Sequence, residues 1–232
     1  MDFGMPATEG GLILSPAPWI GGGASSGRPS RSRPLALPDF LSRLQEACDP
    51  VVDVPRVEEL LADWRPSLES LGPWIAFDPL SYSRQQLYRD PSFELLLLCW
   101  DRGQATPVHD HDGQAGWITV LEGTLTVQEY ERYGGPADLR DLTSAELTPP
   151  DTVPLGPARR LTVSAGSSVA EAAAPETIHR VGPSGGRALS LHLYAGPLDS
   201  FLVFDPERGT ARRVRPQASR SSSSNRTAQE KP

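Results

Sequence analysis

From Gly72-Pro73 onward, the sequence consists of short runs of strand-forming residues separated by glycine, proline and aspartate, and this pattern constrains the fold more than any other feature. The clearest runs are 93–100, 117–121, 124–130, 160–163 and 188–194. Several short strands with turn signals between them are typical of a β-sandwich or a small barrel. We therefore predict a mainly β fold over this part of the chain.

Two short helices are predicted ahead of the strands. Proline favours the first turn of a helix, and Pro38 and Pro55 each precede residues that repeat at helical spacing. The apolar faces consist of Phe40, Leu41, Leu44 and Cys48 in the first helix, and of Val57, Leu60, Leu61 and Trp64 in the second. We expect Pro66 to end the second helix, and the pair to form a cap packed on the β region.

The two ends of the chain have a different composition. Both are rich in Ser, Arg, Gly and Pro, as in the stretch 25–34 and in the serine run 221–224. Such segments bury too little apolar surface to offset the entropy of ordering them. The predicted organisation is a disordered segment 1–37, a helical cap 38–70, a β-barrel domain 71–205 and a disordered basic tail 206–232.

Composition excludes several classes of function. The net charge of −7 and the pI near 5.1 argue against binding of nucleic acid by the whole chain, and no apolar run approaches the length of a membrane span. The N-terminus lacks the basic start of a signal peptide. Cys48 and Cys99 give no disulfide framework, as expected in a reducing cytoplasm. We expect a cytoplasmic monomer with neither nucleic-acid nor membrane partners.

All four histidines of the chain fall within the predicted β region: His109, His111, His179 and His192. His109 and His111 are two residues apart, so on a strand both imidazoles project from one face. If that face is the interior of a small barrel, the pair can hold one transition metal ion. The alternative is a pair of surface histidines on a strand edge.

The surroundings of His109 and His111 favour the metal site. The stretch 103–123 resembles the first motif of the cupin superfamily, a group of small β-barrels, with Gly116 at the position of the usual glutamate ligand. His179, in Pro-Glu-Thr-Ile-His, loosely fits the second cupin motif, with Thr177 at its glycine position. The alternative for His179 is an ordinary core or surface histidine. Three neutral imidazoles without a carboxylate leave the charge of the metal for the substrate to compensate, and an anionic thiolate suits that role.

His192 lies in a strand in which Ser190, His192 and Tyr194 alternate with leucines. The three polar side chains therefore share one face of the strand. Buried polar groups need hydrogen-bond partners, so we predict a Ser–His–Tyr relay that orients the Tyr194 hydroxyl near the metal. The alternative is an amphipathic strand with a solvated polar face. A nucleophilic serine is disfavoured because Ser190 is not on a G-x-S-x-G turn.

Taken together, these motifs resemble the cysteine dioxygenase type I family. The resemblance covers residues 38–205 and includes Tyr82-Ser-Arg84, Leu98-Cys-Trp100, His109-x-His111, His179-Arg-Val and Ser190-Leu-His-Leu-Tyr194. It implies a cupin barrel with an N-terminal helical region and a non-haem Fe(II) held by His109, His111 and His179. It also implies that both atoms of O2 are added to the sulfur of a small thiol, L-cysteine, to give cysteine sulfinic acid.

The same resemblance implies roles for individual residues. Arg84 corresponds to the arginine that pairs with the substrate carboxylate, a task suited to the two parallel donors of a guanidinium. Tyr82 corresponds to a neighbouring pocket tyrosine, and Tyr194 to the active-site tyrosine supported by Ser190 and His192. Trp100 also occupies a family position, although plain core packing explains it equally well.

Gly116 stands where mammalian members have a cysteine that forms a thioether with the tyrosine. As in bacterial members, Tyr194 should then be unmodified.

Two alternatives for the function remain open. A sister branch has glutamine at the position of Arg84 and prefers 3-mercaptopropionate; Gln85 and Gln86 adjoin Arg84, so a shift of one residue in the alignment would weaken the assignment to cysteine. A different class is a non-catalytic cupin module that binds a metabolite or a metal such as zinc. Arg84 and the Ser190–His192–Tyr194 row favour the enzyme, because a metal sensor needs neither.

Overall fold

The computed structural model describes residues 35–134, 153–171 and 177–216. The helices in these ranges are α1 (Leu37–Cys48), α2 (Val54–Asp63), α3 (Leu68–Leu71) and the short 3₁₀ helix η1 (Gly72–Trp74). The strands are β1 (Ser83–Arg89), β2 (Phe93–Trp100), β3 (Val108–His109), β4 (Gly116–Glu122), β5 (Thr124–Arg132), β6 (Leu155–Ser164), β7 (Ser168–Glu171), β8 (Ile178–Pro183), β9 (Ala188–Ala195), β10 (Phe201–Asp205) and β11 (Thr210–Val214).

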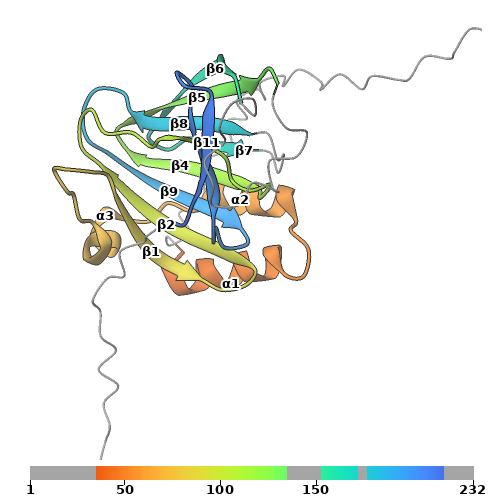
Figure 1. Ribbon diagram of the computed structural model, residues 1–232. Helices are drawn as coiled ribbons and strands as arrows, with labels where there is room; N and C mark the ends of the chain where they lie inside the picture. Colours follow the sequence, from red (N-terminus) through yellow and green to blue (C-terminus); the bar gives the residue numbers. More distant parts are fainter. Residues whose placement is uncertain (1–34, 135–152, 172–176, 217–232) are drawn as a thin grey trace, which may run out of the picture. The chain divides into compact units, whose positions relative to one another are not determined.

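The strands form two antiparallel sheets, shown in Figure 1. One has the order β1-β2-β9-β4-β7 and the other β11-β10-β3-β8-β5-β6. Neighbours in each sheet are often far apart in sequence; β9, for example, pairs with both β2 and β4. The predicted fold class, a mainly β cupin with short N-terminal helices, is confirmed.

Strands β2 and β9 are buried on both faces, which is why β2 is apolar almost throughout its length. Alternate residues of each strand enter different clusters. Leu95, Leu97 and Cys99 pack toward the helices, whereas Leu96 and Leu98 belong to a second cluster between the two sheets. On β9 the leucines take the helix side, so its polar residues lie on the inner side, as the alternation predicts.

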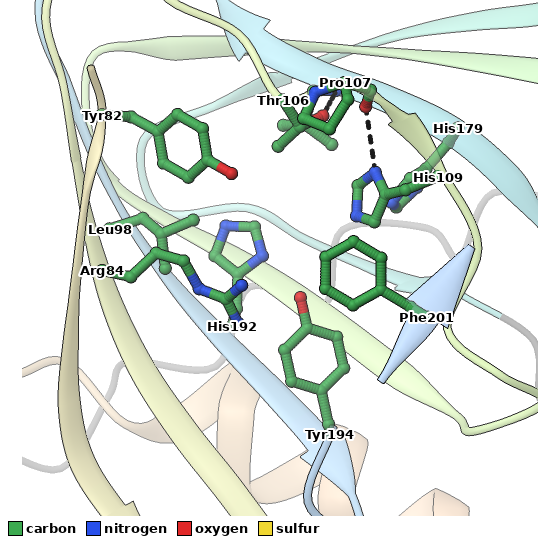
Figure 2. A pocket seen from close by; sticks show the side chains of 11 residues that line it. Tyr82, Arg84, Leu98, Thr106, Pro107, His109, His179, His192, Tyr194 and Phe201 are labelled. Atoms are coloured by element: carbon green, nitrogen blue, oxygen red, sulfur yellow. Dashed lines mark hydrogen bonds between the residues drawn. The ribbon is translucent and has the colours of Figure 1, made fainter. Parts of the chain in front are cut away.

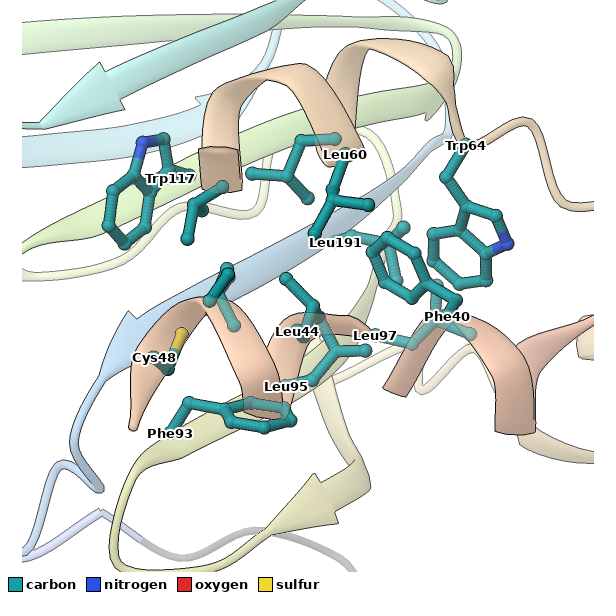
Figure 3. Close-up of a cluster of buried hydrophobic side chains, with 14 of the residues drawn as sticks. Phe40, Leu44, Cys48, Leu60, Trp64, Phe93, Leu95, Leu97, Trp117 and Leu191 are labelled. Atoms are coloured by element: carbon teal, nitrogen blue, oxygen red, sulfur yellow. The ribbon is translucent and has the colours of Figure 1, made fainter. Parts of the chain in front are cut away.

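The helices cover the outer face of the β2–β9 pair, as Figure 3 shows. Asp53 caps α2, its carboxylate accepting a hydrogen bond from the backbone N–H of Arg56 at 3.1 Å. The rings of Phe40 and Trp64 stack with centroids 3.7 Å apart, which joins the two helices predicted from the sequence. None of the described helices is long and apolar enough to span a bilayer.

One predicted boundary is wrong. The segment 206–232 was predicted as a disordered tail, but β10 and β11 form an antiparallel hairpin that continues the second sheet to Val214. The side chain of Ala211 is buried in this hairpin. Four of the five residues of β11 are polar or small, so the strand lacks the apolar pattern that would have marked it. The rest of the predicted tail, 217–232, and the predicted disordered segment up to residue 34 lie outside the described residues.

Candidate metal centre and substrate cavity

A cavity opens between the two sheets, with about 350 Å³ of empty space that is partly open to solvent. Its lining, most of which is labelled in Figure 2, combines polar and apolar side chains: Tyr82, Arg84, Leu98, Thr106, Pro107, His109, His179, Val181, His192, Tyr194 and Phe201.

Three histidines converge at the part of the cavity wall formed by His109 and His179. His109, His111 and His179 are all buried, and each offers a ring nitrogen that lies within 4.8 Å of those of the other two. His109 and His179 are direct cross-strand partners in the β3–β8 ladder, and His111 completes the group with ring centroids 5.5 Å and 4.7 Å from theirs. The predicted convergence of these three side chains is therefore present, and the group contains no carboxylate.

The backbone that brings His109 and His111 together is not the single strand that the spacing predicts. Strand β3 ends at His109, so His111 lies in the turn that follows rather than on the same strand. The intervening Asp110 is 3% exposed, and its carboxylate accepts a hydrogen bond from the backbone N–H of Leu202 on β10 at 2.8 Å. Asp112 has a positive φ of 53° and pairs with Arg213 of β11 at 3.1 Å. The turn that carries His111 is thus held by the hairpin that the sequence did not reveal.

The electrostatics of the three histidines suit a metal cation. Burial lowers the pKa of His179 to about 4, and burial followed by the charge of His179 holds the pKa of His109 well below its usual value. Both rings are therefore neutral at physiological pH, as metal ligation requires. The carbonyl of Pro107 accepts a hydrogen bond from His109 Nδ1 at 3.1 Å, which leaves Nε2 free to face the group. A set of three imidazoles fits a first-row transition metal ion.

The inner face of β9 brings Ser190, His192 and Tyr194 to the cavity side of the sheet. Ser190 Oγ lies 3.0 Å from His192 Nε2, so the first link of the predicted relay is present. The rings of His192 and Tyr194 are 6.5 Å apart between centroids, while the Tyr194 ring lies 5.0 Å from that of His111. The Tyr194 hydroxyl points into the cavity in Figure 2. The Tyr194 ring is thus closer to the ring of His111 than to that of His192.

Arg84 on β1 projects its guanidinium into the cavity beside His192 and Tyr194. Its Nε is buried and has no hydrogen-bond partner within the described ranges. The pKa of His192 lies well below its usual value, first because the ring is buried and second because the positive charge of Arg84 is close to it. Tyr82 lines the same wall and stacks on Trp100 at 4.7 Å. A half-buried guanidinium whose Nε has no partner is suited to an anionic ligand.

Other residues of the cavity were not singled out by the sequence. Phe201, the first residue of β10, lies 5.3 Å from the ring of His109, and Leu98 and Val181 add apolar surface. Thr106 ties the wall to β8, because its hydroxyl accepts a hydrogen bond from the backbone N–H of Val181 at 2.9 Å. Phe201 lies in an apolar run, 201–204, but no sequence signal showed which of these side chains turns toward the histidines.

The chain is similar to known proteins in sequence and in fold. The family model described as cysteine dioxygenase type I matches residues 30–207. The chain is 24% identical to rat "Cysteine dioxygenase type 1" over 184 residues, covering 78% of this chain and 85% of the relative. It is 28% identical to human "2-aminoethanethiol dioxygenase" over 199 residues, covering 77% of this chain and 70% of the relative. A Klebsiella pneumoniae structure described as containing a double-stranded β-helix domain aligns with a TM-score of 0.40 and 14% identity, over 57% of this chain and 87% of that one.

Proposed function

The chain belongs to the cysteine dioxygenase type I family, and from that membership we propose that it is a non-haem iron thiol dioxygenase that oxidises L-cysteine with O2 to cysteine sulfinic acid. The observation that carries the proposal is a group of three buried imidazoles, two of which line the cavity, opposite an arginine whose Nε has no hydrogen-bond partner within the described ranges. The first suits a metal ion and the second an anionic group of the substrate.

In this proposal His109, His111 and His179 hold Fe(II), which supplies the activation of O2 beside the bound thiol. The burial of all three imidazoles and the lowered pKa values of His109 and His179 support the assignment, because a neutral ring nitrogen is the form that binds a metal. The absence of a carboxylate from the group leaves positive charge that a thiolate can offset.

Arg84 binds the carboxylate of the substrate. Its Nε has no hydrogen-bond partner among the described residues, and a bidentate pair with a carboxylate would fix both the position and the orientation of the ligand. The substrate then lies with its anionic end at β1 and its sulfur toward the histidines. A carboxylated thiol fits this arrangement better than 2-aminoethanethiol, the substrate named for the human relative, which has no carboxylate.

Tyr194 donates a hydrogen bond from its hydroxyl into the space between Arg84 and the histidines, where charge develops on oxygen during the reaction. Leu98, Val181 and Phe201 form apolar walls that limit the entry of water and restrict side reactions. The chain's own residues therefore bind, orient and shield the thiol.

The test is to load the full chain with Fe(II) under anaerobic conditions and then measure oxygen consumption with L-cysteine, 3-mercaptopropionate and 2-aminoethanethiol in parallel. The expected result is the highest kcat/KM with L-cysteine and a sulfinate product that carries both atoms of isotopically labelled O2. A zinc-loaded sample is the control and should consume no oxygen. A chain that binds zinc in preference to iron and shows no thiol-dependent oxygen uptake would instead be a non-catalytic binding module.

A further inference from the structure

Trp100, the last residue of β2, supports two walls of the cavity from behind. Its side chain is fully buried, its face stacks on Tyr82 at 4.7 Å, and its indole N–H donates a hydrogen bond to Ser190 Oγ at 2.8 Å. The contact with Ser190 follows from the ladder, in which β2 and β9 are adjacent and Leu98 lies opposite Ser190. Core packing accounts for the burial but not for a directed hydrogen bond to a polar residue of the cavity wall.

The hydrogen bond from Trp100 fixes the direction of the Ser190 hydroxyl. An indole N–H can only donate, so Ser190 Oγ must accept. Within the described ranges this hydroxyl has one other hydrogen-bond partner, His192 Nε2 at 3.0 Å, and Ser190 itself is 0% exposed. A buried O–H that points elsewhere would be unpaired, which is costly. The Ser190 hydroxyl therefore donates to His192 Nε2.

The direction of that bond determines the tautomer of His192. A neutral imidazole carries one proton, and Nε2 must be bare to accept it from Ser190, so the ring proton lies on Nδ1. If His192 instead donated from Nε2, Ser190 Oγ would accept two hydrogen bonds and its own proton would have no partner. The indole N–H strengthens the first arrangement, because a hydroxyl that accepts a hydrogen bond becomes a better donor.

We propose that Trp100 is a positioning residue that acts through Ser190 to hold His192 as the Nδ1-protonated tautomer, so that the ring presents an N–H donor on the cavity side. The proposal rests on the proposed function for its catalytic meaning: a donor beside Arg84 favours a bound anion or the oxygen of Tyr194, whereas a bare nitrogen would repel either.

The first test reads the tautomer directly, without turnover. Long-range ¹H–¹⁵N correlation spectra of the zinc-loaded full chain distinguish the two neutral forms, and assignment is simple because the sequence contains only four histidines. The wild-type chain should show His192 protonated at Nδ1 alone, and Trp100→Phe should show a mixture with Nε2-protonated ring. An Nε2-protonated wild type, or an unchanged Trp100→Phe spectrum, would overturn the proposal.

Trp117→Phe is the matched control. Trp117 is 3% exposed and packs in the cluster on the helix side of the sheet, and its Nε1 is buried without a hydrogen-bond partner among the described residues. This variant loses a buried indole but no hydrogen bond, so the His192 spectrum should match the wild type.

Ser190→Ala provides a second test that leaves Trp100 in place. Like Trp100→Phe, it should give a mixture of the two neutral tautomers of His192. If His192 in Ser190→Ala is still protonated at Nδ1 alone, Ser190 does not set the tautomer.

A double-mutant cycle then tests whether Trp100 acts through Ser190. With Fe(II) and L-cysteine, Trp100→Phe should lower kcat by about two- to tenfold, the size expected for one hydrogen bond. In the Ser190→Ala background the same substitution should have no further effect, because the residue that transmits it is gone. Additive losses would show that Trp100 acts by another path. The tautomer measurement keeps this proposal testable even if L-cysteine proves not to be the substrate.

Discussion

His109 on β3 and His179 on β8 lie directly opposite each other in an antiparallel ladder, with ring centroids 4.6 Å apart. Residues 70 positions apart in the sequence are thus brought together by backbone pairing. The third ring, that of His111, depends instead on a turn held by Asp110 and Leu202. The β3–β8 pair therefore positions the imidazoles of His109 and His179, and the turn bonded to Leu202 positions that of His111.

Loss of a single ligand should abolish stable metal binding. His111→Ala is expected to weaken Fe(II) affinity by more than about 100-fold, because loss of an outer hydrogen bond to a metal ligand already costs roughly 10- to 100-fold. Metal analysis after gel filtration measures the effect. His192→Gln is the control, since it removes the fourth histidine of the same cavity and should retain iron. Equal iron content in His111→Ala and the wild type would contradict the proposed metal centre.

The Tyr194→Phe variant should bind as much iron as the wild type but have a lower kcat. The substitution removes one hydroxyl from the cavity and leaves the ring that packs 5.0 Å from His111. A single donor to developing charge commonly contributes on the order of 100-fold in kcat. Oxygen uptake with L-cysteine, normalised to bound iron, gives the comparison. A rate equal to that of the wild type would remove the proposed role of this hydroxyl.

Arg84→Gln should change the ranking of substrates. A hydrogen-bonded charge pair contributes about 1.5–3 kcal/mol, so kcat/KM for L-cysteine should fall by roughly 10- to 100-fold. The value for 2-aminoethanethiol should change little, because that thiol has no carboxylate to lose. Parallel oxygen-uptake assays on both thiols are sufficient. If both thiols lose activity equally, Arg84 supports the cavity rather than selecting the carboxylate.

The stability of the metal-free protein should fall as the pH falls from 6.5 to about 4. Burial lowers the pKa of His179 from 6.5 to about 4, so in this window the unfolded chain binds a proton that the folded chain does not, at a cost of about 1.4 kcal/mol per pH unit. Asp110 has the opposite effect, because burial raises its pKa from 3.8 to about 6 and the folded chain takes up the proton first. Urea unfolding at several pH values should therefore show a steeper loss in Asp110→Asn than in the wild type. A slope of opposite sign would mean that the histidines are charged in the folded state.

Tyr194 should carry no covalent modification. Its direct partner on β4 is Gly116, which has no side chain, and both cysteines pack in the cluster on the helix side of the sheet. No thiol of the described chain therefore faces the phenol. Peptide mass analysis of the active enzyme should find the segment around Tyr194 at its unmodified mass. A thioether-linked peptide pair containing Tyr194 would show this expectation to be wrong.

The sequence was informative where burial leaves a regular pattern. The predicted strand 93–100 coincides with β2, because a strand buried on both faces is apolar almost throughout. The alternation in β9 correctly placed Ser190, His192 and Tyr194 on one face, because the leucines between them had to face the helices. The bond between Ser190 and His192 followed from that placement.

The sequence was uninformative where position depends on pairing between distant strands. The indole of Trp100 reaches Ser190 only because of the β2–β9 register, which no local pattern encodes. The β10–β11 hairpin was missed for a related reason: β11 is held largely by backbone pairing and by the ion pair of Arg213 with Asp112, rather than by an apolar stripe. The bracing of the His111 turn was missed with it.

The two faces of strand β9 belong to different parts of the molecule. Leu189, Leu191 and Leu193 pack in the cluster beneath the helices, whereas Ser190, His192 and Tyr194 lie on the cavity side of the sheet. Insertion of one residue within β9 would turn the following leucines toward the cavity and the following polar residues toward the helices, which would disrupt both the apolar cluster and the cavity wall. Substitution of one of these leucines by another aliphatic residue should instead be accommodated by small shifts in the packing of the helices. A conservative change in the helical layer should therefore leave the positions of Ser190, His192 and Tyr194 unchanged.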